Sequence, residues 1–162
     1  MKRLQTVESP ASAVSRREFC ACACQSAALI AAGTFAACGG NSTSPSSNAP
    51  TLSTAPFTVS GRTVTVAVDS GSPLAAVNSA AMVQTPLGTF LVSRTAQETF
   101  SALTAVCTHE GCSVTGFSNN QYVCPCHGSR FTTAGSVANG PATRALQQYT
   151  TQFANGVLTF TV

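Results

Sequence analysis

The sequence predicts an all-β domain, an antiparallel β-sandwich or barrel, over residues 57–162. Short runs alternate apolar and polar residues with a period of two, as residues 63–68 do, and turn signals separate these runs. The dipeptide Asn155-Gly156, which is typical of a tight hairpin, separates the last two runs. After residue 56, no segment of useful length repeats its apolar residues with the helical period. Short strands in succession therefore favour a small β fold.

The expected strands follow one another along the chain. Residues 63–68 alternate valine with threonine or alanine, and Ser60-Gly61 before them is expected to form a turn. Two strands flank the turn Pro86-Leu87-Gly88, and the next strand runs directly into Cys107. The strands expected after residue 68 are residues 81–85, 89–94, 99–106, 113–117, 121–123, 144–153 and 157–162.

Two six-residue segments hold both histidines of the chain and four of its eight cysteines: CTHEGC at 107–112 and CPCHGS at 124–129. Each offers one cysteine and one histidine at ligand spacing, and the four are Cys107, His109, Cys124 and His127. Two thiolates and two imidazoles suit an iron–sulfur centre with a cysteine pair on one iron and a histidine pair on the other. A structural zinc site is the alternative, but it would leave the other two cysteines unexplained.

The pattern C-x-H, followed after fourteen residues by C-x-x-H, resembles the Rieske [2Fe–2S] family over roughly the last hundred residues. The resemblance implies a Rieske-type sandwich with a small cluster-binding subdomain inserted at about residues 105–142. It implies one [2Fe–2S] cluster per chain. The implied ligands are Cys107 and Cys124 on one iron, and His109 and His127 on the other.

The resemblance also implies roles for the neighbours of these ligands. Cys112 and Cys126 resemble the disulfide pair of the respiratory Rieske subgroup, which Rieske ferredoxins and oxygenases usually lack. Ser129 resembles the serine that donates a hydrogen bond to a bridging sulfide. Gly140-Pro141 resembles the loop that covers the cluster from a third side.

Three residues depart from the quinol-oxidising, high-potential members. Phe131 stands where they have tyrosine, so one hydrogen bond toward a cysteine ligand is missing. Glu110 stands where an apolar residue is usual, and a carboxylate there disfavours docking into an apolar quinol pocket. Thr132 stands where many relatives have aspartate. We expect a reduction potential in the upper part of the range of about −150 to +300 mV, but below its top.

Residues 1–38 are expected to be an export signal. Ser15-Arg16-Arg17-Glu18-Phe19 resembles the twin-arginine signal, whose route carries folded proteins, and an uncharged stretch follows it. Phe35-Ala36-Ala37-Cys38 resembles a lipobox, which implies a lipid anchor on Cys38. The alternative is an uncleaved transmembrane helix over residues 19–37, which are only mildly apolar. Residues 39–56, rich in serine, proline and glycine, are expected to be a flexible tether.

Charge and length exclude several functions. Only 8% of the residues are charged, and no basic patch indicates binding to nucleic acid. An oxygenase is not expected, because neither length nor further histidines remain in this sequence for a catalytic iron domain.

The sequence therefore predicts a one-electron carrier at the outer face of the membrane, or in the periplasm with a membrane anchor, rather than a complete enzyme. Its expected partners are a cytochrome c, a quinol-oxidising complex or a periplasmic oxidoreductase. The alternatives are the Rieske subunit of a cytochrome bc-type complex, the small subunit of an exported molybdenum oxidase, and a structural zinc module.

Overall fold

The computed structural model describes residues 49–162, and these residues form the all-β fold that the sequence predicts. The proposed export signal, Cys38 and the first ten residues of the proposed tether lie outside the described residues. Across the described part of the chain, we find no helix with the length and apolarity that crossing a membrane requires. The fold consists of three four-stranded sheets in which all neighbouring strands are antiparallel.

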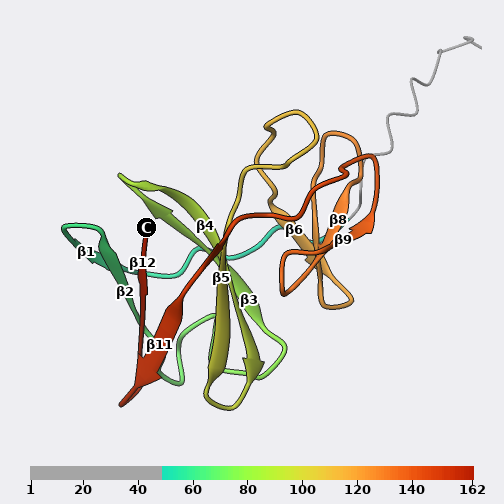
Figure 1. The fold of residues 1–162 in the computed structure, drawn as a ribbon. Helices are drawn as coiled ribbons and strands as arrows, with labels where there is room; N and C mark the ends of the chain where they lie inside the picture. The colour runs from blue at the N-terminus through green and yellow to red at the C-terminus, as the bar shows by residue number, and fades with distance from the viewer. Residues whose placement is uncertain (1–48) are drawn as a thin grey trace, which may run out of the picture. The chain divides into compact units, whose positions relative to one another are not determined.

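We call these the outer, central and site sheets (Figure 1). The outer sheet has the order β1 (Thr58–Ser60), β2 (Thr63–Ala67), β12 (Val157–Thr161), β11 (Thr151–Ala154). The central sheet has the order β10 (Gln148–Tyr149), β5 (Thr99–Thr104), β4 (Gly88–Ala96), β3 (Ala80–Thr85). The site sheet has the order β6 (Gly116–Ser118), β7 (Gln121–Val123), β8 (Arg130–Thr132), β9 (Val137–Asn139), and the chain inserts it between β5 and β10.

The central sheet packs against a hydrophobic core on each of its two faces. Alternate residues of its strands point to opposite sides and so enter different cores. On β4, Leu91 packs into a core shared with the site sheet, whereas Val92 packs into the core under the outer sheet. Leu103 and Ala102 of β5 divide in the same way. All four side chains are fully buried. The central sheet is therefore the support on which the candidate site rests.

Buried polar residues join the central sheet to its surroundings. Ser93 and Ser101 face each other across β4 and β5 with their hydroxyl oxygens 2.9 Å apart, and Ser101 donates to the Thr133 carbonyl at 2.5 Å. Thr133 follows the site-sheet strand β8, so this bond fixes the site sheet to the central sheet. On the opposite face, Arg94 donates to the carbonyls of Ala75 and Gln97 and thereby holds the loop between β2 and β3.

Most expected strands are present with small shifts at their ends, and the hairpin across Asn155-Gly156 is confirmed by the pairing of β11 with β12. Two expectations were wrong in part. Of residues 113–115, only Ser113 forms an isolated bridge, and the strand begins at Gly116. The single strand expected over residues 144–153 is two short strands in different sheets, β10 in the central sheet and β11 in the outer sheet, and residues 144–147 lie outside both. Strands β1, β8 and β9 were not expected, since three residues are too few to show an alternating pattern.

The end of the proposed tether packs against the domain. Thr51 bridges Gly116, and Thr54 bridges Met82 of β3. Ala55 is fully buried and Leu52 is nearly so, each in one of the two cores. The folded part therefore begins before Thr51, earlier than the boundary at residue 57 that composition suggested.

A candidate metal centre of paired thiols and paired imidazoles

The two motif segments form loops that close in the same way. In the first loop, the Cys107 N–H donates to the Cys112 carbonyl at 2.8 Å, and the Gly111 N–H donates to the Cys107 carbonyl at 2.9 Å. The second loop repeats this pattern: the Cys124 N–H donates to the Ser129 carbonyl at 2.9 Å, and the Gly128 N–H donates to the Cys124 carbonyl at 3.0 Å. Each loop is thus closed by backbone hydrogen bonds between its own residues.

Glycine is required at the fifth position of both loops. Gly111 has a φ of +74° and Gly128 a φ of +75°, in the left-handed region that other residues rarely adopt. A Cβ atom at either position would meet no other atom within 4 Å. Backbone conformation, rather than crowding within the chain, therefore explains these two glycines.

The first cysteine of each loop contributes to a buried pair of thiols. Cys107 and Cys124 are free cysteines, exposed by 3% and 1%, and both pack into the core shared by the site and central sheets. Burial raises the pKa of the Cys124 thiol, and the adjacent Cys107 raises it further. The backbone N–H groups of Cys126 and His127 donate to the Cys124 sulfur and act in the opposite direction, because they stabilise a thiolate. A bound metal would take the place of the proton.

The two histidines face each other at the tips of the loops. Their Nδ1 atoms are 3.2 Å apart, and the planes of the His109 and His127 rings are nearly perpendicular, at 88°. Two nitrogens bound to one tetrahedral metal at about 2.05 Å would be roughly 3.3 Å apart. The imidazole pair is thus already spaced to share one metal through Nδ1.

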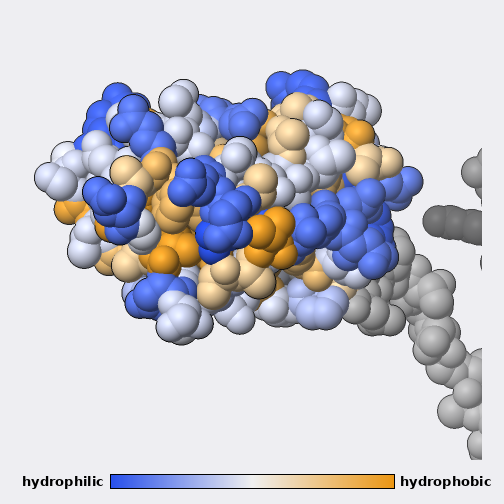
Figure 2. Space-filling model, turned by 90° about the horizontal axis from the view of Figure 1, so that it is seen from below, coloured by the Kyte–Doolittle hydropathy of each residue, from blue (hydrophilic) through white to orange (hydrophobic). Residues whose placement is uncertain are grey.

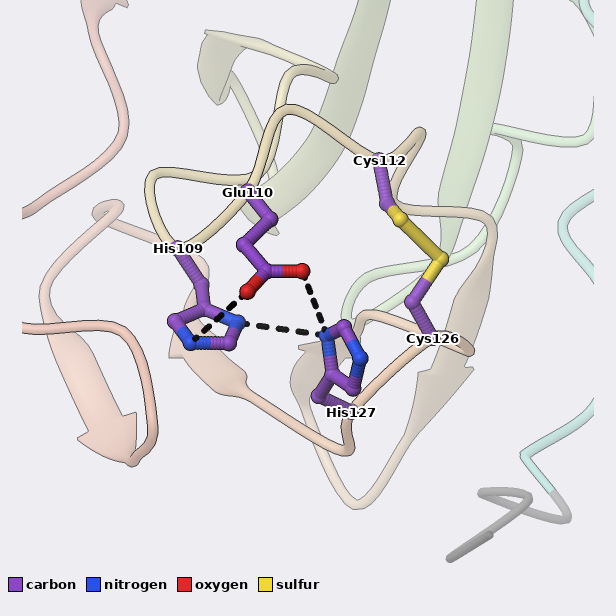
Figure 3. The surroundings of a disulfide bond; sticks show 5 residues. All are labelled: His109, Glu110, Cys112, Cys126 and His127. Atoms are coloured by element: carbon purple, nitrogen blue, oxygen red, sulfur yellow. Dashed lines mark hydrogen bonds and ion pairs between the residues drawn. A yellow bond between two sulfur atoms is a disulfide. The ribbon is translucent and has the colours of Figure 1, made fainter.

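The remaining two cysteines of the motif segments are joined. Cys112 and Cys126 form a disulfide with an S–S distance of 2.08 Å, which links the first ligand loop to the second beside the histidines (Figure 3). The structure therefore contains the disulfide that the sequence resemblance implied. The bond leaves Cys107 and Cys124 as the free thiols of the described residues.

The potential metal-ligand atoms of the described residues fall into separate groups. Among the described residues, ligand atoms gather within 4.8 Å of one another in two groups: His109, Glu110 and His127, and separately Cys112, Cys124 and Cys126. One tetrahedral ion bound by two thiolates and two imidazoles would need all four donors around a single point. No such group contains both free cysteines and both histidines, and Cys124 lies in a different group from the imidazoles. This separation fits a two-iron centre with thiolates on one iron and imidazoles on the other.

Ser129 connects the second ligand loop to the loop that contains Gly140-Pro141. Its hydroxyl oxygen is fully buried and accepts a hydrogen bond from the Ala142 N–H at 3.0 Å. The Gly140-Pro141 peptide bond that precedes Ala142 is cis. Because the Ser129 oxygen serves as an acceptor here, its own proton is free to be donated to a bound group.

Thr108 is a site residue that the sequence reasoning missed. Its hydroxyl donates to the Arg144 carbonyl at 2.6 Å, which ties the first ligand loop to the segment that leads into β10. Ser101, which holds the carbonyl of Thr133 after β8, was missed as well. Each bond spans more than thirty residues of sequence, and an isolated serine or threonine gives no local signal for such a partner.

Two of the three residues that depart from the high-potential pattern, Phe131 and Glu110, lie in different surroundings. The Phe131 side chain is fully buried with both ligand cysteines in the core shared by the site and central sheets. Glu110 is exposed, and its carboxylate oxygens lie 3.9 Å from His109 Nε2 and 3.7 Å from His127 Nδ1 (Figure 3). Tyr122 pairs with Phe131 across β7 and β8, and its side chain is fully buried with its hydroxyl near Ser93.

A small all-β domain that presents paired thiols and paired imidazoles on two disulfide-linked loops belongs to the class of iron–sulfur proteins. The model of the Rieske [2Fe-2S] domain matches residues 45–150. The chain therefore belongs to the Rieske [2Fe-2S] family, and its cofactor is a [2Fe–2S] cluster.

Curated relatives match over shorter stretches. The cytochrome b6-f complex iron-sulfur subunit of Chlorobaculum thiosulfatiphilum is 46% identical over 50 residues, which are 30% of this chain and 28% of that protein. The subunit of the same name from Cyanothece sp. is 43% identical over 60 residues, which are 36% of this chain and 34% of that protein. The matched stretches thus span about a third or less of these relatives.

A solved structure is also similar. The cyanobacterial plasma membrane Rieske protein PetC3 from Synechocystis PCC 6803 is 35% identical to this chain, with a TM-score of 0.47. The match covers 51% of this chain and 86% of that one.

Proposed function

We propose that this protein is a one-electron carrier whose [2Fe–2S] cluster is bound by Cys107, Cys124, His109 and His127. The observation that carries the proposal is the arrangement of the four residues: two free, buried cysteines in one core cluster, and two exposed histidines whose Nδ1 atoms are 3.2 Å apart. The cluster, when bound, supplies the exchange of a single electron. The chain holds it, limits water at the cysteine side and exposes the histidine side.

The exposure of the proposed ligands indicates the route by which electrons enter and leave the cluster. The side chains of His109 and His127 are 28% and 45% exposed, whereas both ligand cysteines are buried. Electrons should therefore enter and leave through the imidazoles, where a partner can approach most closely. Ser129 and the backbone N–H groups around Cys124 would lower the energy of the reduced cluster by hydrogen bonds.

We further propose that the domain works outside the cytoplasm and is attached to the membrane. The twin-arginine-like segment at Arg16-Arg17 supports export of a folded, cluster-loaded protein, and Cys38 supports a lipid anchor. The residues between Cys38 and Thr51 would form the tether. The mass of the purified membrane form tests this directly: a mature chain starting at a lipid-modified Cys38 is expected, and an unprocessed N-terminus would contradict it.

A second candidate function is that of the Rieske subunit of a quinol-oxidising complex. The names of the curated relatives, iron-sulfur subunits of the cytochrome b6-f complex, favour it. Glu110 opposes it, because docking into an apolar quinol pocket would bury its carboxylate. Co-purification of a cytochrome b with the chain from its native membrane would support the second candidate over a separate carrier.

The ligand assignment is tested by elemental analysis of single variants. The wild-type protein should contain two irons and two acid-labile sulfides per chain, and C107S, C124S, H109A and H127A should each lose most of both. S113A is a matched control in the same region that leaves all four ligands in place. Stoichiometric zinc in place of iron, or full iron content in a ligand variant, would overturn the assignment.

A further inference from the structure

Glu110 places a negative charge at the point where electrons would leave the protein. We define the histidine face as His109, Glu110 and His127. The Glu110 side chain is 61% exposed, more than either imidazole beside it. Its two carboxylate oxygens reach toward different histidines, 3.9 Å from the first ring and 3.7 Å from the second (Figure 3). Any group that approaches either imidazole therefore approaches this carboxylate.

No arginine neutralises this carboxylate in the described part of the chain, where its only ion-pair contacts are the two imidazoles. Arg144 lines the same open cavity, of about 680 Å³, together with Glu110 and Val106. Val106 is the most exposed of the large apolar side chains, at 55%. The cavity is thus lined by one acidic and one basic residue, and it is the acidic one, Glu110, whose carboxylate lies beside both imidazoles.

Apolar surface alone does not define a partner here. The exposed large apolar residues of the described chain are Val59, Val77, Leu87, Val106 and Val157, which come from separate strands and loops. On the face shown in Figure 2, hydrophilic side chains interrupt the apolar surface. Charge is therefore the more informative property of the histidine face.

From these observations, and resting on the electron-carrier function proposed above, we propose that the histidine face selects a cationic redox partner. The partner is a protein whose electron-exchanging group is surrounded by lysine or arginine side chains. A charged group within about 4 Å of either imidazole lies within one Debye length, about 8 Å, of the Glu110 carboxylate at physiological ionic strength. Complementary charge at that distance raises the rate of association and rejects partners of the same charge.

Two inorganic oxidants of opposite charge test the selection without knowledge of the natural partner. The cluster-loaded chain is reduced and mixed in a stopped-flow instrument with tris(phenanthroline)cobalt(III), which carries +3, or with ferricyanide, which carries −3. The informative quantity is the ratio of the two rate constants. A change in the reduction potential of the cluster alters both rates in the same direction, so the ratio isolates the electrostatic effect.

E110Q removes the charge and keeps the size of the side chain, and E98Q is the matched control. Glu98 is an exposed glutamate in the turn between β4 and β5, at the end of β5 far from the ligand loops. At 10 mM ionic strength, E110Q should lower the cation-to-anion ratio by roughly five- to tenfold. E98Q should leave the ratio nearly unchanged, and E110K should lower it further. At high ionic strength, the cation-to-anion ratios of wild type and E110Q should become similar, because salt screens the charge of Glu110.

The outcomes separate this inference from the function on which it rests. If both oxidants react with the reduced chain but E110Q and E98Q give the same ratio, the selection by Glu110 is wrong while the electron carrier stands. If neither oxidant is reduced by a chain with a full complement of iron, the carrier function fails and the selection fails with it. A cation-to-anion rate ratio that falls in E110Q and E110K but not in E98Q supports the proposal.

Discussion

At the scale of single residues, the Cys124 thiol shows how the site is prepared for a metal. Burial raises its pKa, so the folded, metal-free chain holds the proton at a pH where the unfolded chain has lost it. The resulting stability is fully present below the unfolded pKa of about 8.5 and is lost as the pH rises above it. The metal-free domain should therefore melt at a progressively lower temperature between pH 8.5 and 10.

Calorimetry on the metal-free protein with its disulfide intact checks this dependence. C124S lacks the titrating thiol and should show a flatter profile over the same range, although other groups titrate in both proteins. The cluster-loaded protein should also be flatter, because iron holds the thiolate and removes its titration. Parallel profiles for wild type and C124S would contradict the argument.

Single residues were predicted best where chemistry restricts the choice. The chain has only two histidines, and the sequence analysis paired them with each other as ligands; the structure places their rings next to each other. The two cysteines that the analysis grouped with them are the free cysteines of the described residues. Ser93 was not expected to be buried, because a serine within a strand gives no sign of which face it occupies. Its burial depends on Ser101, which lies opposite it only once β4 and β5 are paired.

At the scale of elements, the disulfide holds the two ligand loops together before any metal binds. Cys112 and Cys126 are 14 residues apart, and closing a loop of this length stabilises a protein by about 3 kcal/mol in the chain-entropy model. The double variant C112S/C126S should therefore lower the free energy of unfolding of the metal-free domain by about that amount. Urea titration measures the difference, and wild type under reducing conditions should match the double variant.

The strand β4 offers a matched pair of substitutions, since Leu91 and Val92 are neighbours that face different layers. L91A leaves a cavity beneath the site and should cost about 2–5 kcal/mol, and V92A should also destabilise the fold. Only L91A should change the cluster as well, as a broadened electron paramagnetic resonance (EPR) signal or a lower iron content. Equal effects of both substitutions on the cluster would show that the central sheet does not separate the two cores.

Elements with a strong local signal were predicted, whereas several of the three-residue strands were not. Asn155-Gly156 favours a tight turn, and Asn155 has the positive φ, +52°, that such a turn requires. Strands β8 and β9 contain three residues each and are held by their neighbours in the site sheet, so no local pattern reveals them. Leu52 and Ala55 occur in a stretch whose composition is that of a linker, and only their contacts with the two cores show otherwise.

At the scale of the whole described part, the fold separates support from function. The central sheet is buried between two layers, and the chain inserts the site sheet and both ligand loops between β5 and β10 (Figure 1). The ligand loops are fixed by several independent ties: the disulfide, the bond from Thr108 to Arg144 and the bond from Ala142 to Ser129. A rigid site suits electron transfer, because little has to move when the charge of the cluster changes.

The central claim is that this chain holds a redox-active Rieske cluster with a relatively high potential. EPR spectroscopy of the purified protein, reduced first with ascorbate and then with dithionite, tests it most directly. The account predicts a Rieske-type signal after ascorbate, with little gain after dithionite. A signal that requires dithionite would contradict the expected potential, and a chain with bound zinc and no signal under either reductant would contradict the electron-carrier function.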